Sequence, residues 1–237
     1  MGSDRSAAAD GHPWRLASAQ VFVEDLGAPE LTDADAHHVE RVLRISGDEQ
    51  LCVSDGAGGW RMCELDSAGG LRAAGEPEWV DRPQPTLTVG FAAPKGERTE
   101  WAVRKLTEVG VDRIAVLRTG RSVVRWDAGR AERQLSKMHR WVRESARQCR
   151  RLWLPAVTIG TMADLAGSLL AGAALADAGG RRVETGDHTI LVGPEGGWTD
   201  EEREGRDVVA LGEHVLRTET AAVLAGSAMA SFRLWRD

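Results

Sequence analysis

Two segments near the C-terminus carry residue types that could bind a ligand through the main chain. Residues 191–199 read LVGPEGGWT and residues 216–222 read LRTETAA. Each is an apolar, strand-like stretch that turns through small residues and continues as a helix, which is how α/β proteins bring backbone N–H groups to a ligand. Because the two segments follow one another closely in the chain, we predict that both loops line one pocket.

The first segment has the residues of a tight loop before a helix. Its glycines permit positive φ angles and a close approach to a ligand, while Pro194 fixes its own φ. Thr199 together with Glu202 forms a capping-box pattern, which predicts that a helix begins after Thr199. A simple turn between a strand and a helix would use the same residues, so from these residues alone a ligand loop and a plain turn both remain open.

The second segment is predicted to begin a buried helix. Thr218 or Thr220 could supply the helix cap, and the body of the helix is apolar as far as Trp235. Glu219 lies between the two threonines and could orient a ligand or tie the two loops together. The same two roles are open to Glu195 in the first loop, where the structural one is favoured.

Positive charge is concentrated in one stretch of an acidic protein. The net charge is −6, yet residues 118–151 include eleven Arg or Lys and three Asp or Glu. This stretch predicts an amphipathic helix with a cationic face, which would attract phosphates and release counterions on binding. A solvated helix face is the alternative. Trp141 and Trp153 could stack on bases, but core positions are favoured for both. The charged face consists of Arg130, Arg133, Lys137, Arg140, Glu144, Arg147 and Arg151.

Strands and helices alternate after a linker rich in proline and charge at residues 76–85. Such alternation implies a parallel sheet covered on both faces. We predict strands at 87–92, 113–117, 157–159 and 173–176, a helix at 99–109 ended by Gly110, and a helix around 162–171.

The part before the linker is predicted to be a small β-barrel. Its predicted strands lie at 21–23, 50–56 and 59–65, with a capped helix at 32–44. The chain is therefore expected to form two domains, at residues 15–80 and 85–237.

The composition is that of a globular protein. The chain has 237 residues, 42% of them hydrophobic, which argues against disorder. No apolar run approaches the ~20 residues of a membrane helix and no signal segment opens the chain, so we expect a soluble, cytoplasmic protein without a membrane partner. Cys52, Cys63 and Cys149 lack the paired spacing of zinc ligands. They are predicted to be buried thiols, with no metal site.

Five segments, in their order, resemble the ribosomal RNA small-subunit methyltransferase E family, one of the SPOUT or trefoil-knotted methyltransferases. They are FAAPKGER at 91–98, KLTEVGV at 105–111, the stretch 144–151, GPEGG at 193–197, and LG at 211–212 followed by VLRTETA at 215–221. The resemblance covers nearly the whole chain from about Gln20. It implies methylation of N3 of one uridine in 16S ribosomal RNA, with S-adenosyl-L-methionine as the methyl donor.

The resemblance also implies an architecture and partners. It implies an α/β fold with a C-terminal SPOUT-type knotted parallel-sheet methyltransferase domain and an N-terminal PUA-like β-barrel. The implied partners are 16S ribosomal RNA or the assembled small ribosomal subunit, and a second copy of the chain in a homodimer. The implied cofactor contacts are Leu175, Leu191, Gly193, Pro194, Glu195, Gly196, Gly197, Leu211, Gly212, Leu216, Thr218 and Ala221.

Methylation of N3 requires loss of the N3 proton and stabilisation of negative charge on O2 and O4. Arg217 could donate to a uracil carbonyl or to a phosphate through the fork of its guanidinium. Glu144, the lone acid of the cationic face, is a candidate base, although the neighbouring arginines would make it a weak one. Where the family often has Glu-Gln-(Ser or Cys)-Gly-Arg, residues 147–151 read RQCRR, so Gln148 is the retained polar group. The predicted RNA contacts are Arg41, Arg44, Lys95, Arg98, Arg133 and Arg140.

Two alternative functions stay open at this point. One is a SPOUT methyltransferase with another RNA target, and the other is a non-catalytic RNA-binding protein of the same fold. A dinucleotide-dependent dehydrogenase is disfavoured, because residues 193–197 do not form the Gly-x-Gly-x-x-Gly pattern and lie late in the chain.

Overall fold

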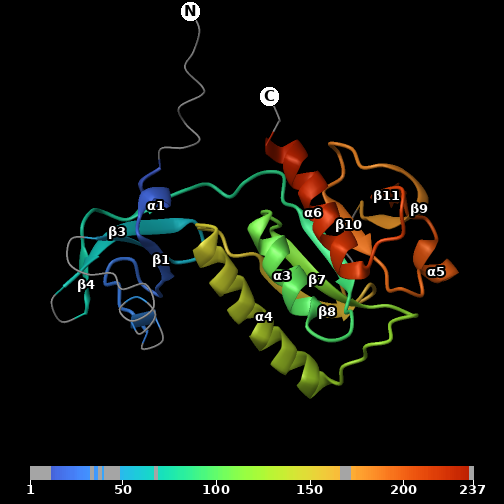
Figure 1. Ribbon diagram of the computed structural model, residues 1–237, viewed down its shortest axis with the longest axis horizontal. Helices are drawn as coiled ribbons and strands as arrows, with labels where there is room; N and C mark the ends of the chain where they lie inside the picture. The colour runs from blue at the N-terminus through green and yellow to red at the C-terminus, as the bar shows by residue number, and fades with distance from the viewer. Residues whose placement is uncertain are drawn as a thin grey trace, which may run out of the picture. The chain divides into compact units, whose positions relative to one another are not determined.

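A computed structural model describes residues 12–32, 35–36, 39, 49–66, 69–165 and 172–234. They form two compact units (Figure 1). The first contains the described residues up to Arg82 together with residues 146–154, and the second contains residues 83–145 and the described residues from Pro155 on. The predicted helix at 32–44 lies almost entirely outside the described residues, as do Arg41 and Arg44.

The first unit is built on a small, mostly antiparallel sheet. The strands follow the order β1-β2-β3-β4, β5 also pairs with β3, and only β1 and β2 are parallel. Val21, Leu51 and Val53 are fully buried in its core. Successive side chains of a strand point to opposite faces of the sheet, so Leu51 and Val53, which are two residues apart, face the same side. The elements are α1 (Pro13–Leu16), β1 (Ala19–Phe22), β2 (Gln50–Ser54), β3 (Gly59–Leu65), β4 (Leu71–Ala73) and β5 (Glu78–Trp79).

Residues 146–154 return to this first unit. The main-chain N–H of Leu154 donates to the carbonyl of Gly56 (2.9 Å), and the indole Nε1 of Trp153 donates to the carbonyl of Val80 (2.9 Å). The predicted domain bounds, 15–80 and 85–237, place this segment in the C-terminal domain instead. The difference arises because these hydrogen bonds join residues far apart in the chain, which local patterns do not reveal.

The second unit contains a six-stranded sheet in the order β11-β9-β10-β6-β7-β8, and every pairing in it is parallel. This confirms the predicted α/β class with a parallel sheet. The trefoil knot implied by the resemblance stays a prediction. The elements are β6 (Thr88–Ala92), α3 (Arg98–Glu108), β7 (Arg113–Arg118), α4 (Ala128–Gln148), β8 (Ala156–Thr161), β9 (Ala174–Arg182), β10 (Thr189–Val192), α5 (Asp200–Arg203), β11 (Val208–Ala210) and α6 (Thr218–Leu234).

Two helices cover the same part of this sheet. Figure 1 shows α3 and α6 side by side, and α6 packs on β6 and β10. Gly110, with φ of +95°, follows α3 as predicted, because a left-handed residue ends a helix without a Cβ clash. The last residues of α4 belong to the first unit, while most of the helix belongs to the second. Within the described residues, no helix is both long and apolar enough to cross a lipid bilayer.

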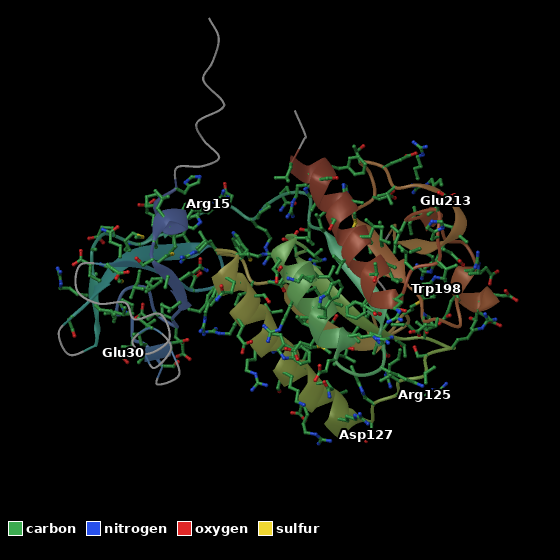
Figure 2. All side chains as sticks on the ribbon, in the orientation of Figure 1. Arg15, Glu30, Arg125, Asp127, Trp198 and Glu213 are labelled. Carbon is green, nitrogen blue, oxygen red and sulfur yellow. The ribbon has the colours of Figure 1, made fainter. Side chains whose placement is uncertain are left out.

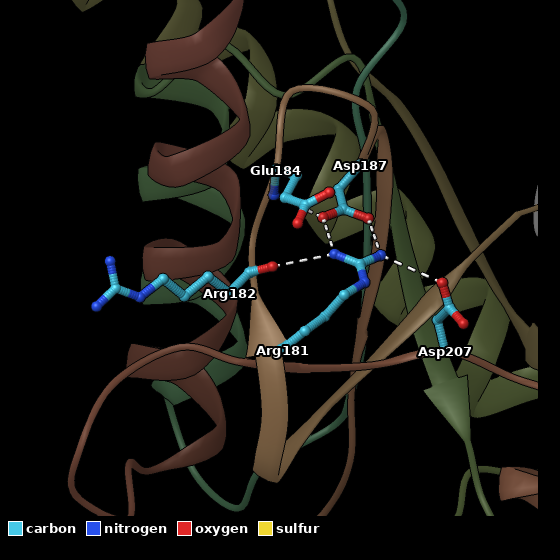
Figure 3. Close-up of polar contacts among 5 residues, drawn as sticks. All are labelled: Arg181, Arg182, Glu184, Asp187 and Asp207. Carbon is cyan, nitrogen blue, oxygen red and sulfur yellow. Dashed lines mark hydrogen bonds and ion pairs between the residues drawn. The ribbon is translucent and has the colours of Figure 1, made fainter.

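A cluster of ion pairs lies at the carboxyl end of β9 (Figure 3). The guanidinium of Arg181 donates two hydrogen bonds of 2.7 Å to the carboxylate of Asp187 and one of 3.2 Å to Asp207. Asp187 also accepts the main-chain N–H of Glu184 (2.8 Å). The hydrogen bonds from Arg181 lower the pKa of the Asp187 carboxyl group.

We therefore expect Asp187→Asn to destabilise the protein by about 2 kcal/mol at pH 7, since Arg181 loses a charged, largely buried partner. A lowered pKa in the folded state stabilises the protein above about pH 4, and this contribution is lost as the pH falls through the lowered pKa. Denaturant unfolding from pH 7 to pH 3 should show the difference from the unsubstituted protein shrinking. Asp207→Asn, at a side chain that is 75% exposed, is the matched control and should change stability by under about 0.5 kcal/mol. A difference for Asp187→Asn that does not vary with pH would contradict this role.

The three cysteines differ in exposure. Cys52 and Cys63 are buried as predicted, whereas the prediction is wrong for Cys149, which is exposed just after the end of α4. Burial raises the pKa of Cys52 to about 12. We expect a maleimide to label one thiol per native chain, on Cys149, and three after denaturation, as counted by mass spectrometry. Labelling of Cys149→Ser in the native state would contradict the described burial.

Candidate functional site

The two predicted loops meet at one edge of the parallel sheet. Strands β10 and β11 both pair with β9 in parallel, so their carboxyl ends lie at the same edge. The residues after β10 and after β11 start there. The hydroxyl of Thr218 donates a hydrogen bond to the main-chain carbonyl of Gly193 (3.1 Å), which joins the two loops directly.

A pocket of about 240 Å³ lies between these loops. Six of its lining residues are glycine or alanine. Nine of the predicted cofactor contacts line it: Gly193, Pro194, Glu195, Gly197, Leu211, Gly212, Leu216, Thr218 and Ala221. Residues that sequence reasoning did not single out complete the wall: Ala176, Asp177, Ala178, Val192, Trp198, Glu213, His214 and Val215.

Three predicted cofactor contacts do not line this pocket. Leu175 and Leu191 are fully buried and face each other in register on β9 and β10, so their side chains belong to the core. A Cβ on Gly196 would lie 3.3 Å from the Cβ of Arg121, so this glycine faces the loop after β7. Leu175, Leu191 and Gly196 differ from the nine pocket-lining residues in their contacts with segments distant in the sequence. Local sequence patterns do not show such contacts.

The first loop is stabilised by its own residues and by Trp198. The predicted capping box is confirmed: the hydroxyl of Thr199 accepts the N–H of Glu202, whose carboxylate accepts the N–H of Thr199. The indole Nε1 of Trp198 donates to the carbonyl of Ala176 (3.2 Å), and Figure 2 shows Trp198 near the amino-terminal end of α6. A Cβ on Gly193 would approach the Trp198 ring to 3.0 Å, so any side chain at this position would require the ring to shift.

The second loop ends in the first turn of α6. Thr218 is the first residue of the helix, and its hydroxyl donates to the first loop, which differs from the predicted capping role. Arg217 is exposed, and its guanidinium has no hydrogen-bond or ion-pair partner among the described residues. Glu219 is buried and lies 3.5 Å from the Nε of Arg98 at the start of α3. The pair therefore links α6 to the loop after β6.

The loop after β7 is attached to the first loop. Arg121 donates from Nη1 to the carbonyl of Gly196 (3.0 Å), and the N–H of Gly120 donates to Glu202 (2.8 Å). Figure 2 shows Arg125 farther along this loop and Asp127 next to the start of α4. The cationic helix is thus continuous in the chain with a loop that contacts the pocket wall.

The predicted catalytic residues come from two elements: Glu144 and Gln148 belong to α4, and Arg217 directly precedes α6. Glu144 on α4 forms an ion pair with Arg104 on α3 (2.6 Å), and Arg104 also contacts Glu100 (2.8 Å). Gln148 is exposed and belongs to the segment that packs in the first unit. Of the three, only Arg217 adjoins residues that line the pocket.

The predicted RNA contacts on the second unit are surface residues. Lys95, Arg133 and Arg140 are exposed, and Arg98 is paired with Glu219. The α4 helix has the predicted second face, with Met138 and Val142 buried. Arg41 and Arg44 lie outside the described residues.

Comparison with known proteins defines the class. Residues 81–230 match the family described as the RNA methyltransferase domain, and residues 31–76 match the RNA methyltransferase PUA domain. The solved structure of a putative methyltransferase from Legionella pneumophila, in complex with the bound cofactor SAM, has a TM-score of 0.75 and 25% identity, covering 90% of this chain and 96% of that one. The fold is thus that of an RNA methyltransferase with an N-terminal PUA-like domain.

The relatives define the family more closely. A ribosomal RNA small subunit methyltransferase E from Mycobacterium bovis is 36% identical over 224 residues, covering 85% of this chain and 86% of the relative. A protein of that name from Neisseria gonorrhoeae, solved bound to S-adenosyl methionine, is 26% identical with a TM-score of 0.74, covering 92% of this chain and 98% of that one. This chain belongs to the ribosomal RNA small subunit methyltransferase E family.

Proposed function

We propose that this protein transfers a methyl group from S-adenosylmethionine to N3 of one uridine in 16S ribosomal RNA. The observation that carries the proposal is the hydrogen bond between Thr218 and Gly193, which joins the two loops around a single pocket at the carboxyl edge of the sheet. Ligands of open parallel sheets bind at this edge. The related structures solved with the methyl donor support the same assignment.

The pocket fits such a donor in its chemistry. Its wall supplies main-chain groups that can hydrogen-bond to adenine and to a methionine moiety, together with the apolar ring of Trp198. A Cβ added at Gly212 would meet no other atom within 4 Å, so the main chain there borders open space that a ligand can occupy. We propose that the predicted cofactor residues act mainly through their backbone, and that Leu175, Leu191 and Gly196 shape the wall from behind it.

Arg217 is the residue we assign to the reaction itself. When bound, S-adenosylmethionine supplies a methyl group attached to a positively charged sulfur. Arg217 lies between the pocket-lining residues Leu216 and Thr218, and its guanidinium is free of other partners among the described residues. It can donate to a uracil carbonyl, which stabilises the imide anion and so favours loss of the N3 proton.

Glu144 is poorly suited to act as the base that takes the N3 proton. Its carboxylate is paired with Arg104, which would have to release it before it could accept a proton. We therefore propose that solvent or the RNA takes the N3 proton, and that Glu144 and Gln148 act on RNA placement.

The partners follow from the surface of the second unit. Lys95, Arg133 and Arg140 are exposed cations suited to RNA phosphates, and we assign Arg98, Arg41 and Arg44 to the same task. The substrate is proposed to be 16S ribosomal RNA or the assembled small subunit, which places the protein in the cytoplasm. We propose that residues 15–80 form an RNA-binding domain and that residues 85–237 form the methyltransferase domain.

We also propose a homodimer. Two large apolar side chains are exposed on the adjacent helices α3 and α6: Trp101 is 45% exposed and Leu224 is 39% exposed. Apolar side chains of this size on neighbouring helices are typical of a subunit contact. Sedimentation of the purified chain tests this, and a monomer at micromolar concentration would contradict it.

The test of the proposed function is nucleoside mass spectrometry of 16S ribosomal RNA from a strain that lacks the gene, with and without complementation. We expect N3-methyluridine to be absent from the deletion strain and restored by the intact gene. Loss of a ribose methyl group or of a transfer-RNA methyl group would identify another target. An unchanged set of modified nucleosides would favour a non-catalytic RNA-binding protein.

A further inference from the structure

A second hollow of the second unit lies between the loop after β6 and the helix α4. It measures about 470 Å³ and is separate from the pocket between the two C-terminal loops. One wall is formed by residues 94–100 and the other by α4, with the end of the loop after β7 between them. We call this hollow the α4 groove. Its lining is Pro94, Lys95, Gly96, Glu97, Thr99, Glu100, Val124, Trp126, Arg130, Gln134, Lys137 and Trp141.

A single face of α4 lines the groove. Arg130, Gln134, Lys137 and Trp141 follow one another at steps of four, three and four residues, which places them along one side of an α-helix. Arg133 and Arg140 do not line the groove. The cationic face predicted from the sequence is therefore divided into a part that enters the groove and a part that does not.

The groove carries positive charge that the protein does not neutralise. Lys95, Arg130 and Lys137 are exposed, and none of their side chains has a hydrogen-bond or ion-pair partner among the described residues. Of the two acids in the lining, Glu100 is already paired with Arg104, so Glu97 is the acid left to oppose these cations. Three free cations on two facing walls suit a phosphodiester chain.

The interior of the groove is aromatic. Trp126 and Trp141 both belong to the lining, and each is 9% exposed, so a small part of each residue is open to a ligand in the groove. A surface that combines cations with aromatic rings is typical of sites that hold unpaired nucleotides, because bases pack on the rings while phosphates contact the cations.

The groove starts next to the cofactor pocket. In the parallel pair β6 and β10, Phe91 lies opposite Val192, so the residues that follow β6 and those that follow β10 leave the sheet at the same edge. Adjacent strands are only ~5 Å apart. A nucleotide beside one that is held at the cofactor pocket can therefore reach the groove.

We infer that the α4 groove binds unpaired RNA next to the target nucleotide, with phosphates on Lys95, Arg130 and Lys137 and a base against Trp126 and Trp141. This inference rests on the proposed function, since it takes an RNA substrate as its occupant. It distinguishes the groove cations from the other exposed cations of the same helix.

The helix supplies a matched pair of variants. R130Q/K137Q removes two groove cations, and R133Q/R140Q removes two exposed cations of equal spacing that lie outside the groove. Both variants change the net charge equally, and all four side chains are exposed, so folding should be retained. With small subunits that lack the modification and saturating S-adenosylmethionine, we expect R130Q/K137Q to raise the KM for RNA by about tenfold or more. R133Q/R140Q removes only phosphate contacts outside the groove, so we expect it to raise the KM by a smaller factor, about threefold. Equal effects of the two variants would overturn the inference.

A binding experiment separates this inference from the proposed function. A single-stranded, uridine-containing oligonucleotide carrying a photoreactive uracil is titrated against each variant, and the crosslinked residue is identified by mass spectrometry. We expect crosslinks at Trp126 or Trp141 and a larger loss of affinity in R130Q/K137Q than in R133Q/R140Q. If the protein methylates no ribosomal RNA but gives this pattern, the proposed function fails and the groove stands. If the protein methylates 16S ribosomal RNA but crosslinks only outside the groove, the groove assignment fails alone.

Discussion

Replacement of Gly193 by valine is expected to abolish binding of S-adenosylmethionine at concentrations that saturate the unsubstituted protein. The new Cβ would approach the Trp198 ring to 3.0 Å, and the carbonyl of the same residue accepts the Thr218 hydroxyl. Displacing Trp198 removes one wall of the pocket and disturbs the contact between the loops. Overpacking of this kind costs about 2 kcal/mol or more, which corresponds to at least ~30-fold in affinity. Isothermal titration calorimetry provides the measurement.

A matched substitution separates this effect from general destabilisation. Gly186 lies in the same unit, its φ is not in the left-handed region, and an added Cβ would meet nothing within 4 Å. Gly186→Val should therefore leave cofactor affinity within twofold of the original, by the small effect usual for exposed sites. Thermal unfolding of both variants shows whether the fold is kept, and Gly193→Ala gives a milder version if the valine variant unfolds. A folded Gly193→Val protein with undiminished affinity would remove this loop from the site.

Arg217→Ala is expected to lower kcat about 10²–10³-fold while leaving the affinity for S-adenosylmethionine nearly unchanged. The reason is that Arg217 is exposed beside the pocket, does not line it, and is assigned to the charge that develops on uracil. Single-turnover methylation of small subunits at saturating RNA measures the chemical step. Calorimetry with the methyl donor measures binding separately.

Arg217→Lys is the control for charge alone. Lysine keeps one positive charge but lacks the planar fork of donors, so it should recover only part of the lost rate. A loss confined to KM, with kcat retained in Arg217→Ala, would show that Arg217 binds RNA without stabilising the reacting base. That outcome would contradict the role assigned here.

Local patterns predicted much of the fold. The capping box of Thr199 and Glu202 lies within four consecutive residues, and Gly110 lies two residues after the last residue of α3. Signals of this kind act over one turn of a helix, so the sequence contains all that is needed to interpret them. The alternation of strands and helices likewise indicated a parallel sheet.

Contacts between distant residues could not be predicted in the same way. The ion pair of Glu144 with Arg104 joins two helices, and the sequence around the candidate base Glu144 does not reveal this partner. The return of residues 146–154 to the first unit depends on hydrogen bonds such as that from Trp153 to Val80. In each case, the sequence around one partner gives no sign of the other partner.

The candidate site contains both features that local patterns predict and contacts between distant residues that they do not. The loops after β10 and β11 could be identified from their small residues, but the hydrogen bond of Thr218 to Gly193 crosses from one loop to the other. The family resemblance implied cofactor contacts at Leu175 and Leu191, and the structure places their side chains in the core between β9 and β10. Sequence thus indicated which loops form the pocket, and only the packed sheet decided which residues face into it.

The central claim is that the two loops joined by Thr218 and Gly193 hold the methyl donor. A crystal structure of the protein grown with S-adenosylmethionine tests this most directly. We predict the donor in the pocket between the loops, in contact with residues from both 193–198 and 211–218. A donor bound elsewhere on the chain, or loops separated so that no single ligand contacts both, would contradict the account.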